Sequence, residues 1–312
     1  MLEKRAIMLV FSIIIIVQLC GCASEIETSR LSDLGGVYLS NIEDVDFSTE
    51  ITGSLPEDTL NQITVKVEQM AEEASANTQF SNTLRSWGLK RNPDNRIPDA
   101  DPGAPELLKK YGGFYLGDTT KKVIYLTFDE GYENGYTPKI LDVLRDNKVK
   151  GVFFITGPYL KEHQDLVRRM VEEGHIVGNH TIHHPSLPSL DDKQVEEEVL
   201  GLDRVFYEKF GKHMKYLRPP KGEYSERTLA LTSKLGYINV FWSFAYDDWY
   251  RDRIRGPEYA YSKVMDNLHN GAVLLLHAVS KDNADALDRI IKGVREKGYE
   301  IGSLDDINVA GS

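Results

Sequence analysis

The chain has 312 residues, of which 41% are hydrophobic, and a formal net charge of −11. This composition excludes a fibrous or wholly disordered chain, and the negative charge argues against binding to nucleic acid or to anionic surfaces. Beyond an N-terminal leader, the length suffices for one large α/β domain and an accessory segment.

The N-terminus has the pattern of an export signal. Lys4 and Arg5 precede an apolar stretch, which predicts a signal peptide at residues 1–21. A glycine directly before Cys22 is similar to a bacterial lipobox, so Cys22 is expected to be the lipid-modified first residue of the mature chain. An uncleaved signal anchor is the alternative. Both place the protein outside the cytoplasm, anchored to the outer face of the cell membrane.

Residues 22–86 are expected to form a tether followed by a helical extension. The first part is polar without a clear period, whereas residues 55–87 carry apolar side chains at helical spacing. We interpret these helices as a spacer or as a docking surface for a protein partner. Residues 91–105 are rich in Pro, Asp and Asn and are expected to be a linker.

Strand and helix patterns alternate from residue 123 onward, within a domain that we place at residues 87–308. Strands are expected at 123–128, 151–156, 175–178, 215–217, 238–242, 272–276 and 299–301, and helices at 138–147, 164–173, 190–210, 226–235, 259–269 and 284–297. This alternation predicts right-handed βαβ units with parallel strands. About seven such strands favour a distorted or incomplete (β/α) barrel. A doubly wound open sheet is the alternative that periodicity leaves open.

Polar side chains follow these strands at their carboxyl ends. Because the carboxyl ends of parallel strands meet at one rim of an α/β fold, we expect these side chains to converge. In chain order they are Asp129, Glu130, Asn179, His180, His183, His184, Arg218, Gly222, Asp247, Asp248, Trp249 and His277.

The histidines on this rim suggest a metal site. His180 and His184 are four residues apart, so a single turn could direct both rings at one point, and His183 is the alternative to His184. Both cysteines of the chain lie in the leader, so any metal ion must be bound by histidine and carboxylate. Two imidazoles and one carboxylate, with a position open to water, are typical of a catalytic zinc-type site.

Asp129 and Glu130 can then take different roles. One carboxylate would coordinate the ion, and the other would accept a proton from the water that the ion binds, since a nearby cation keeps such a base ionised. His277 could donate a proton to a departing amine. Asp248 could neutralise Arg218 or orient His277, and the sequence does not distinguish between these roles.

The loop after the fourth strand contains two consecutive prolines between Arg218 and Lys221. The prolines stiffen the loop, and Gly222 would allow its backbone to approach a ligand. The backbone N–H of Lys221 could then stabilise a developing oxyanion.

Together these residues resemble the polysaccharide deacetylases of carbohydrate esterase family four. Five motifs carry the resemblance: Thr-Phe-Asp-Glu-Gly at 127–131, His-Thr-Ile-His-His-Pro at 180–185, Arg-Pro-Pro-Lys-Gly at 218–222, Asp-Trp at 248–249 and Leu-Leu-His at 275–277. The resemblance implies a distorted (β/α) barrel that hydrolyses N-acetyl groups of amino sugars.

The resemblance also implies roles for individual residues. Asp129 would be the base and His277 the acid, while Glu130, His180 and His184 would bind one divalent metal ion. Zn²⁺ is favoured over Mg²⁺, Mn²⁺ or Co²⁺. The family has aspartate where this chain has Glu130, and the additional methylene could make the coordination water-mediated or alter the metal preference.

Within the family, the chain is most similar to the sporulation peptidoglycan N-acetylmuramic acid deacetylases of muramic δ-lactam synthesis. The similarity lies in residues 87–88, 131–138 and 279–284. It implies peptidoglycan glycan strands as substrate, at muramic residues without their peptide. Many relatives carry an aromatic residue at the position of Lys221, and we hypothesise that Lys221 pairs with the lactyl carboxylate of such a residue.

Parts of the sequence also suggest two other functions. A glycan-binding lipoprotein without catalytic activity is favoured only by Glu130. A glycosidase with paired carboxylates is disfavoured, because the side chains of Asp129 and Glu130 diverge from adjacent positions and cannot flank one bond.

Overall fold

The structure, a computed structural model, describes residues 80–307. The predicted signal peptide, the lipidation site Cys22, the tether and most of the helical extension lie outside the described residues. Among the helices at residues 80–307, none combines the length and the apolar character that crossing a membrane requires.

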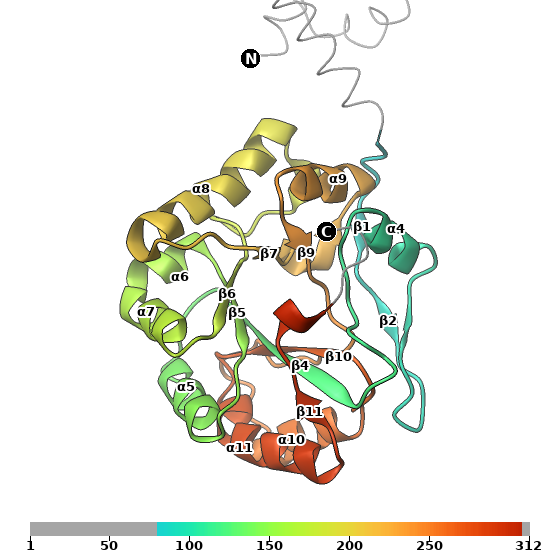
Figure 1. The fold of residues 1–312 in the computed structure, drawn as a ribbon, viewed down its shortest axis with the longest axis vertical. Helices are drawn as coiled ribbons and strands as arrows, with labels where there is room; N and C mark the ends of the chain where they lie inside the picture. Colours follow the sequence, from blue (N-terminus) through green and yellow to red (C-terminus); the bar gives the residue numbers. More distant parts are fainter. Residues whose placement is uncertain (1–79, 308–312) are drawn as a thin grey trace, which may run out of the picture. The chain divides into compact units, whose positions relative to one another are not determined.

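Parallel strands form the central sheet, and there are seven of them in residues 80–307, as the sequence predicts. The order is β10-β4-β5-β6-β7-β9, and β11 also pairs with β4. An isolated parallel bridge between Phe244 and Leu274 links the chain after β9 back to β10, so the sheet curves into an incomplete barrel (Figure 1). The strands are β4 (Val123–Glu130), β5 (Val152–Ile155), β6 (Ile176–Asn179), β7 (Tyr216–Leu217), β9 (Ile238–Asn239), β10 (Ala272–His277) and β11 (Glu300–Ile301).

Helices connect successive strands and lie outside the barrel (Figure 1). They are α5 (Thr137–Asp146), α6 (Gly157–Glu162), α7 (Gln164–Glu172), α8 (Asp192–Phe210), α9 (Glu226–Lys234), α10 (Pro257–Met265) and α11 (Lys281–Glu296), with short 3₁₀ turns η2 (Leu187–Ser189), η3 (Pro220–Gly222) and η4 (Leu304–Asp306). The sequence predicts each α-helix of this set except α6. That helix has only six residues, too few to show a helical period.

Strand β4 shows why the central strands have continuous apolar sequences. Ile124, Leu126 and Phe128 pack in the large core between sheet and helices, whereas Tyr125 packs in a second core with Phe154, inside the barrel. Because both faces of the strand are covered, its first four residues, Val123 to Leu126, are all apolar. Full burial of one such side chain contributes roughly 1.5–3 kcal/mol to stability.

The folded unit begins earlier than the predicted boundary at residue 87. Strand β1 (Arg85–Ser86) pairs antiparallel with β8 (Glu223–Tyr224), and Asn82 Nδ2 donates a hydrogen bond to the carbonyl of Pro188. Residues 80–86, which the sequence assigns to the helical extension, are therefore extended chain in the same unit as the barrel.

The expected linker at residues 91–105 is also partly structured. It contains β3 (Asp99–Ala100), which pairs with β2 (Leu89–Lys90), and the start of helix α4 (Ala104–Lys110). Strands of two residues have no detectable period, so their pairing is decided by tertiary contacts.

Candidate active site

The carboxyl ends of β4, β6, β7 and β10 meet at one end of the barrel, as expected. In the register of the sheet, Asp129 of β4 lies opposite His277 of β10. A cavity of about 700 Å³ opens at this end. Its lining includes Asp129, Tyr132, Thr156, His180, His183, His184, Lys221, Gly222, Trp242, Trp249, Leu275 and His277.

Asp129 and Arg218 form a buried ion pair at the floor of this cavity. Arg218 Nη1 donates a 2.7 Å hydrogen bond to Asp129 Oδ1, and the arginine side chain is fully buried. Burial alone would raise the pKa of Asp129. The positive charge of Arg218, together with His180 and His277, outweighs burial and lowers that pKa below its ordinary value. Asp129 is therefore ionised at neutral pH, as a general base must be.

Arg218 is itself held by the barrel interior. Its Nε donates to the carbonyl of Val240 at 3.2 Å, and its guanidinium carbon lies 4.1 Å from the centroid of the Phe154 ring. These contacts fix the fork of the guanidinium toward Asp129. The charge of Arg218 is thus neutralised by Asp129. Asp248, for which the sequence allows this role, does not perform it.

His180 is oriented by a backbone carbonyl. Its Nδ1 lies 2.8 Å from the carbonyl oxygen of Arg218, which can only accept, so Nδ1 carries the proton. Burial lowers the pKa of His180, which leaves Nε2 with a free lone pair. That Nε2 lies 3.5 Å from Asp129 Oδ2. Both atoms are acceptors, so they do not hydrogen-bond to each other directly.

The turn that carries the histidines has a strained backbone. Thr181 and His184 adopt φ values of 68° and 59°, a left-handed conformation that is unfavourable for side chains other than glycine. The turn is fixed by Asn179 Oδ1, which accepts from the N–H of Thr181, and by Glu198 of α8, whose Oε2 accepts from the N–H of His183.

The same turn distinguishes His184 from His183. The ring of His184 lies 4.7 Å from that of His180, and burial, followed by the neighbouring His180, lowers the pKa of His184 to about 4. His183 instead pairs with Glu198 at 2.7 Å, and its side chain is 72% exposed. His180 and His184 are therefore the pair of imidazoles that share one point, as the sequence predicts.

Glu130 does not join them. Strand β4 continues through Glu130, which pairs in register with Ile155, so its side chain points to the face opposite that of Asp129. It is fully buried, with Oε1 3.5 Å from Thr137 Oγ1 and Oε2 without a partner among the described residues. Burial, reinforced by Glu133, raises the pKa of Glu130 well above its ordinary value.

The expected set of metal ligands is therefore not assembled. Within residues 80–307, no three His, Cys, Asp or Glu side chains are grouped so that they could hold a metal ion. His180 and His184 line the cavity, but Glu130 lies outside it and burial raises its pKa, which disfavours the charged form that binds a metal ion. The sequence pattern missed this because it assumes that the strand ends before the two carboxylates.

Asp248 orients His277, which is the second role that the sequence allows for this carboxylate. Asp248 Oδ1 lies 2.7 Å from His277 Nδ1, and Oδ2 accepts from the backbone N–H of His277 at 2.9 Å. Burial would lower the pKa of His277, but the charge of Asp248 outweighs it and raises that pKa. The imidazole can therefore act as an acid near neutral pH.

Asn283 completes this group and was not singled out from the sequence. Its Nδ2 donates to Asp248 Oδ2 at 2.6 Å and to the carbonyl of His277 at 3.2 Å, while its Oδ1 accepts from the hydroxyl of Tyr246. Asn283 lies in the segment 279–284 that carries part of the family resemblance, which was the available signal.

Three further predicted residues lie at the cavity, whereas Asp247 does not line it and pairs with Arg253 and Arg255. Trp249 packs edge-on at 5.9 Å from the His277 ring, and Lys221 lines the cavity with an exposed side chain. Gly222 has φ 67°, and a Cβ there would lie 2.8 Å from the Trp242 ring. This glycine is thus required by packing, and its own N–H donates to the carbonyl of Pro219.

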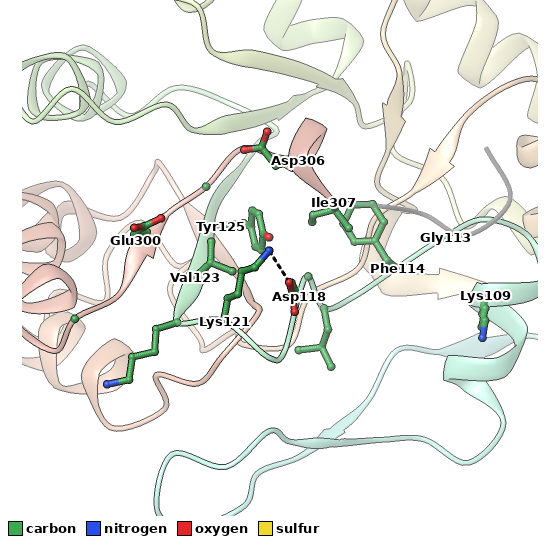
Figure 2. Close-up of a pocket in the computed structure, with 15 residues that line it drawn as sticks. Lys109, Gly113, Phe114, Asp118, Lys121, Val123, Tyr125, Glu300, Asp306 and Ile307 are labelled. Carbon is green, nitrogen blue, oxygen red and sulfur yellow. Dashed lines mark ion pairs between the residues drawn. The ribbon is translucent and has the colours of Figure 1, made fainter.

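A second cavity, of about 770 Å³, lies at the opposite end of the barrel, where β4 and β11 begin. Figure 2 shows Lys121 directed at Asp118 there, and their side chains form a 3.0 Å ion pair. No histidine lines this cavity, and the predicted catalytic residues are absent from its lining among residues 80–307. The predicted base and acid, Asp129 and His277, line the cavity at the carboxyl ends of the strands instead.

Comparison with known proteins identifies the family to which the chain is similar. Residues 116–240 match the polysaccharide deacetylase family. Over 223 residues the chain is 47% identical to the peptidoglycan-N-acetylmuramic acid deacetylase PdaA of Bacillus subtilis. The aligned region covers 71% of this chain and 85% of that protein.

Solved structures give the same result. The structure of Bacillus subtilis PdaA, a family 4 carbohydrate esterase, matches with a TM-score of 0.71 and 46% identity, over 73% of this chain and 97% of that one. A family 4 carbohydrate esterase from Bacillus anthracis matches with a TM-score of 0.62 and 48% identity, over the same shares of the two chains. The chain described here therefore belongs to the polysaccharide deacetylase family.

Proposed function

We propose that this protein is a peptidoglycan N-deacetylase that acts on N-acetylmuramic acid residues. The observation that carries the proposal is the pairing of Asp129 and His277 on neighbouring strands of one cavity, with pKa values shifted in opposite directions. Such a pair supplies a base and an acid at the same pH. The name of the similar Bacillus subtilis protein supports peptidoglycan as the substrate.

The reaction is hydrolysis of the acetamide bond. Oδ1 of Asp129 is held by Arg218, so Oδ2 is free to take a proton from the attacking water as it adds to the acetyl carbonyl. The backbone N–H of Lys221 stabilises the resulting oxyanion. His277, whose Nδ1 is bound by Asp248, donates a proton through Nε2 to the departing sugar nitrogen. Acetate and the free amino sugar are the products.

Deacetylases of this family depend on a metal ion in general. The residues of this chain that would hold one are His180 and His184, and two imidazole ligands favour Zn²⁺ over Mg²⁺, Mn²⁺ or Co²⁺. The third expected ligand, Glu130, does not fit. Elemental analysis of the purified wild-type protein and of His180→Ala would identify an ion and show whether this pair binds it.

Lys221 is proposed to select muramic over glucosamine residues. Lys221 lines the cavity with an exposed side chain, and no ion pair joins it to a carboxylate of residues 80–307. A muramic residue without peptide carries a lactyl carboxylate that can fill this role. Lys221→Met is expected to reduce activity on the muramic sugar and to leave activity on a glucosamine sugar unchanged. Wild-type activity of Lys221→Met on both sugars would contradict this assignment.

The cellular role is inferred from the N-terminus and the substrate. An export signal with Cys22 as lipidated residue, or an uncleaved anchor, would place the enzyme on the outer face of the membrane, where peptidoglycan lies. Muramic δ-lactam formation during sporulation is the proposed context, and the part of the predicted helical extension before residue 80 is a proposed docking segment. Fractionation of cells that express wild type or Cys22→Ala would test the anchor.

The experiment that tests the activity uses purified glycan strands with peptide-free muramic residues. Mass spectrometry after incubation should show loss of acetyl from muramic residues, and Asp129→Asn and His277→Ala should each lose about 10²–10⁴-fold in rate. A wild-type protein that binds these strands without releasing acetate would instead be a glycan-binding lipoprotein.

A further inference from the structure

Exposed aromatic side chains gather beside the active-site cavity. Tyr132, Trp249 and Tyr250 are 37%, 46% and 43% exposed, and the nearby Ile254 is 59% exposed. The rings of Trp249 and Tyr250 lie 5.4 Å apart with an interplanar angle of 36°. Exposed apolar surface of this kind, next to a cavity, marks a contact with a ligand.

Arg251 adds a positive charge to this surface. Its guanidinium carbon lies 3.8 Å from the centroid of the Tyr132 ring, over the aromatic face, which is a cation–π contact. Arg253 and Arg255 of the same loop both pair with Asp247. Arg251, in contrast, has no ion pair with any carboxylate of the described residues, and its side chain is exposed.

This surface is continuous with the active site. Tyr132 and Trp249 line the cavity themselves, and the hydroxyl of Tyr132 donates a 3.1 Å hydrogen bond to the carbonyl of Trp249. The loop after β4 and the loop that carries Arg251 are therefore joined at the edge of the cavity. A glycan strand that extends from the cavity past Trp249 would therefore contact Tyr250 and Arg251.

We propose that Trp249, Tyr250 and Arg251 form a second sugar-binding site for the same glycan strand. The aromatic rings stack on a sugar adjacent to the one that reacts, and Arg251 binds the carboxylate of a further muramic residue. This inference rests on the proposed function, because the substrate must carry carboxylates at regular intervals. An unpaired arginine with a planar fork suits a carboxylate, and the net charge of −11 means that the strand needs local cations to bind.

The test compares two substrates of different length. One is a peptide-free disaccharide with a single muramic residue, and the other is a tetrasaccharide with two. Arg251→Met and Tyr250→Ala should each raise KM for the tetrasaccharide about tenfold without a change in kcat, and should leave KM for the disaccharide unchanged. Arg251→Lys should recover part of the loss, because it keeps the charge without the planar guanidinium.

Arg204→Met is the matched control, since Arg204 is an exposed arginine of α8 whose partner is Glu197. It should behave as wild type on both substrates. If Arg251→Met also matches wild type on the tetrasaccharide, or loses equally on both substrates, the second site is wrong. If wild type deacetylates neither substrate, the failure lies with the proposed function instead.

Discussion

Arg218 Nη1 donates a 2.7 Å hydrogen bond to Asp129 Oδ1, which joins two side chains 89 residues apart in the buried floor of the cavity. Asp129 and Arg218 lie on β4 and directly after β7, so the barrel must form before they meet. The pair keeps Asp129 ionised despite its burial, and it leaves Oδ2 free for chemistry.

Replacing Arg218 with Met should move the pH dependence of the base. Without the guanidinium, burial is less opposed and the pKa of Asp129 rises, so the acidic limb of kcat/KM shifts to higher pH. Loss of one partner also leaves a buried charge, which costs about 3–5 kcal/mol of unfolding free energy. Rate profiles and urea unfolding measure the two effects. An acidic limb that stays at its wild-type position would contradict the role of Arg218.

Asp248→Asn should change the alkaline limb of the pH–rate profile. The folded-state pKa of His277 is raised, which extends the pH range in which the acid is protonated, and activity falls as pH increases through that pKa. Removal of the charge of Asp248 lowers this pKa, and the alkaline limb of the rate profile should move to lower pH. Asp305→Asn, whose carboxylate pairs with Lys215, is the control and should keep the wild-type profile. An unshifted alkaline limb in Asp248→Asn would exclude His277 as the acid.

Glu198→Ala tests the strained histidine turn. Glu198 holds both the backbone N–H and the ring of His183, and their loss should let Thr181 and His184 relax from positive φ. We expect kcat to fall about tenfold with little change in KM, and stability to fall by about 1 kcal/mol. The adjacent exposed Glu197, changed to Ala, should have neither effect. Wild-type kcat in Glu198→Ala would show that the turn keeps its geometry without α8.

Glu130→Gln distinguishes the observed position of Glu130 from the family expectation. The structure places this side chain behind β4, where burial raises its pKa and favours the neutral form, for which glutamine is a close substitute. Activity should stay within about threefold of wild type, a change below 1 kcal/mol in barrier height, and bound metal should be unchanged. His184→Ala, which removes a cavity-lining imidazole, should lose activity. Loss of both metal and activity in Glu130→Gln would restore Glu130 as a ligand.

Much of the fold could be predicted because it is encoded locally. Strands such as β4 and β10 are buried on both faces and therefore appear as continuous apolar runs, and α8 and α11 show a clear helical period. Strands β1 and β3 could not be predicted, because two residues carry no period and their pairing depends on distant partners.

The candidate site likewise has features that the sequence determines and features that only the tertiary structure decides. By itself, the sequence determined the family, the alternation of strands and helices, and the residues at the strand ends, since motifs and apolar periods are local properties of the chain. Only the tertiary structure decided that Asp129 faces Arg218 while Glu130 faces away, and that Asn283 and Glu198 support the site. The reason is that the length of β4, and so the face on which each carboxylate lies, is set by hydrogen bonds to β5 and β10, which are formed by residues far along the chain.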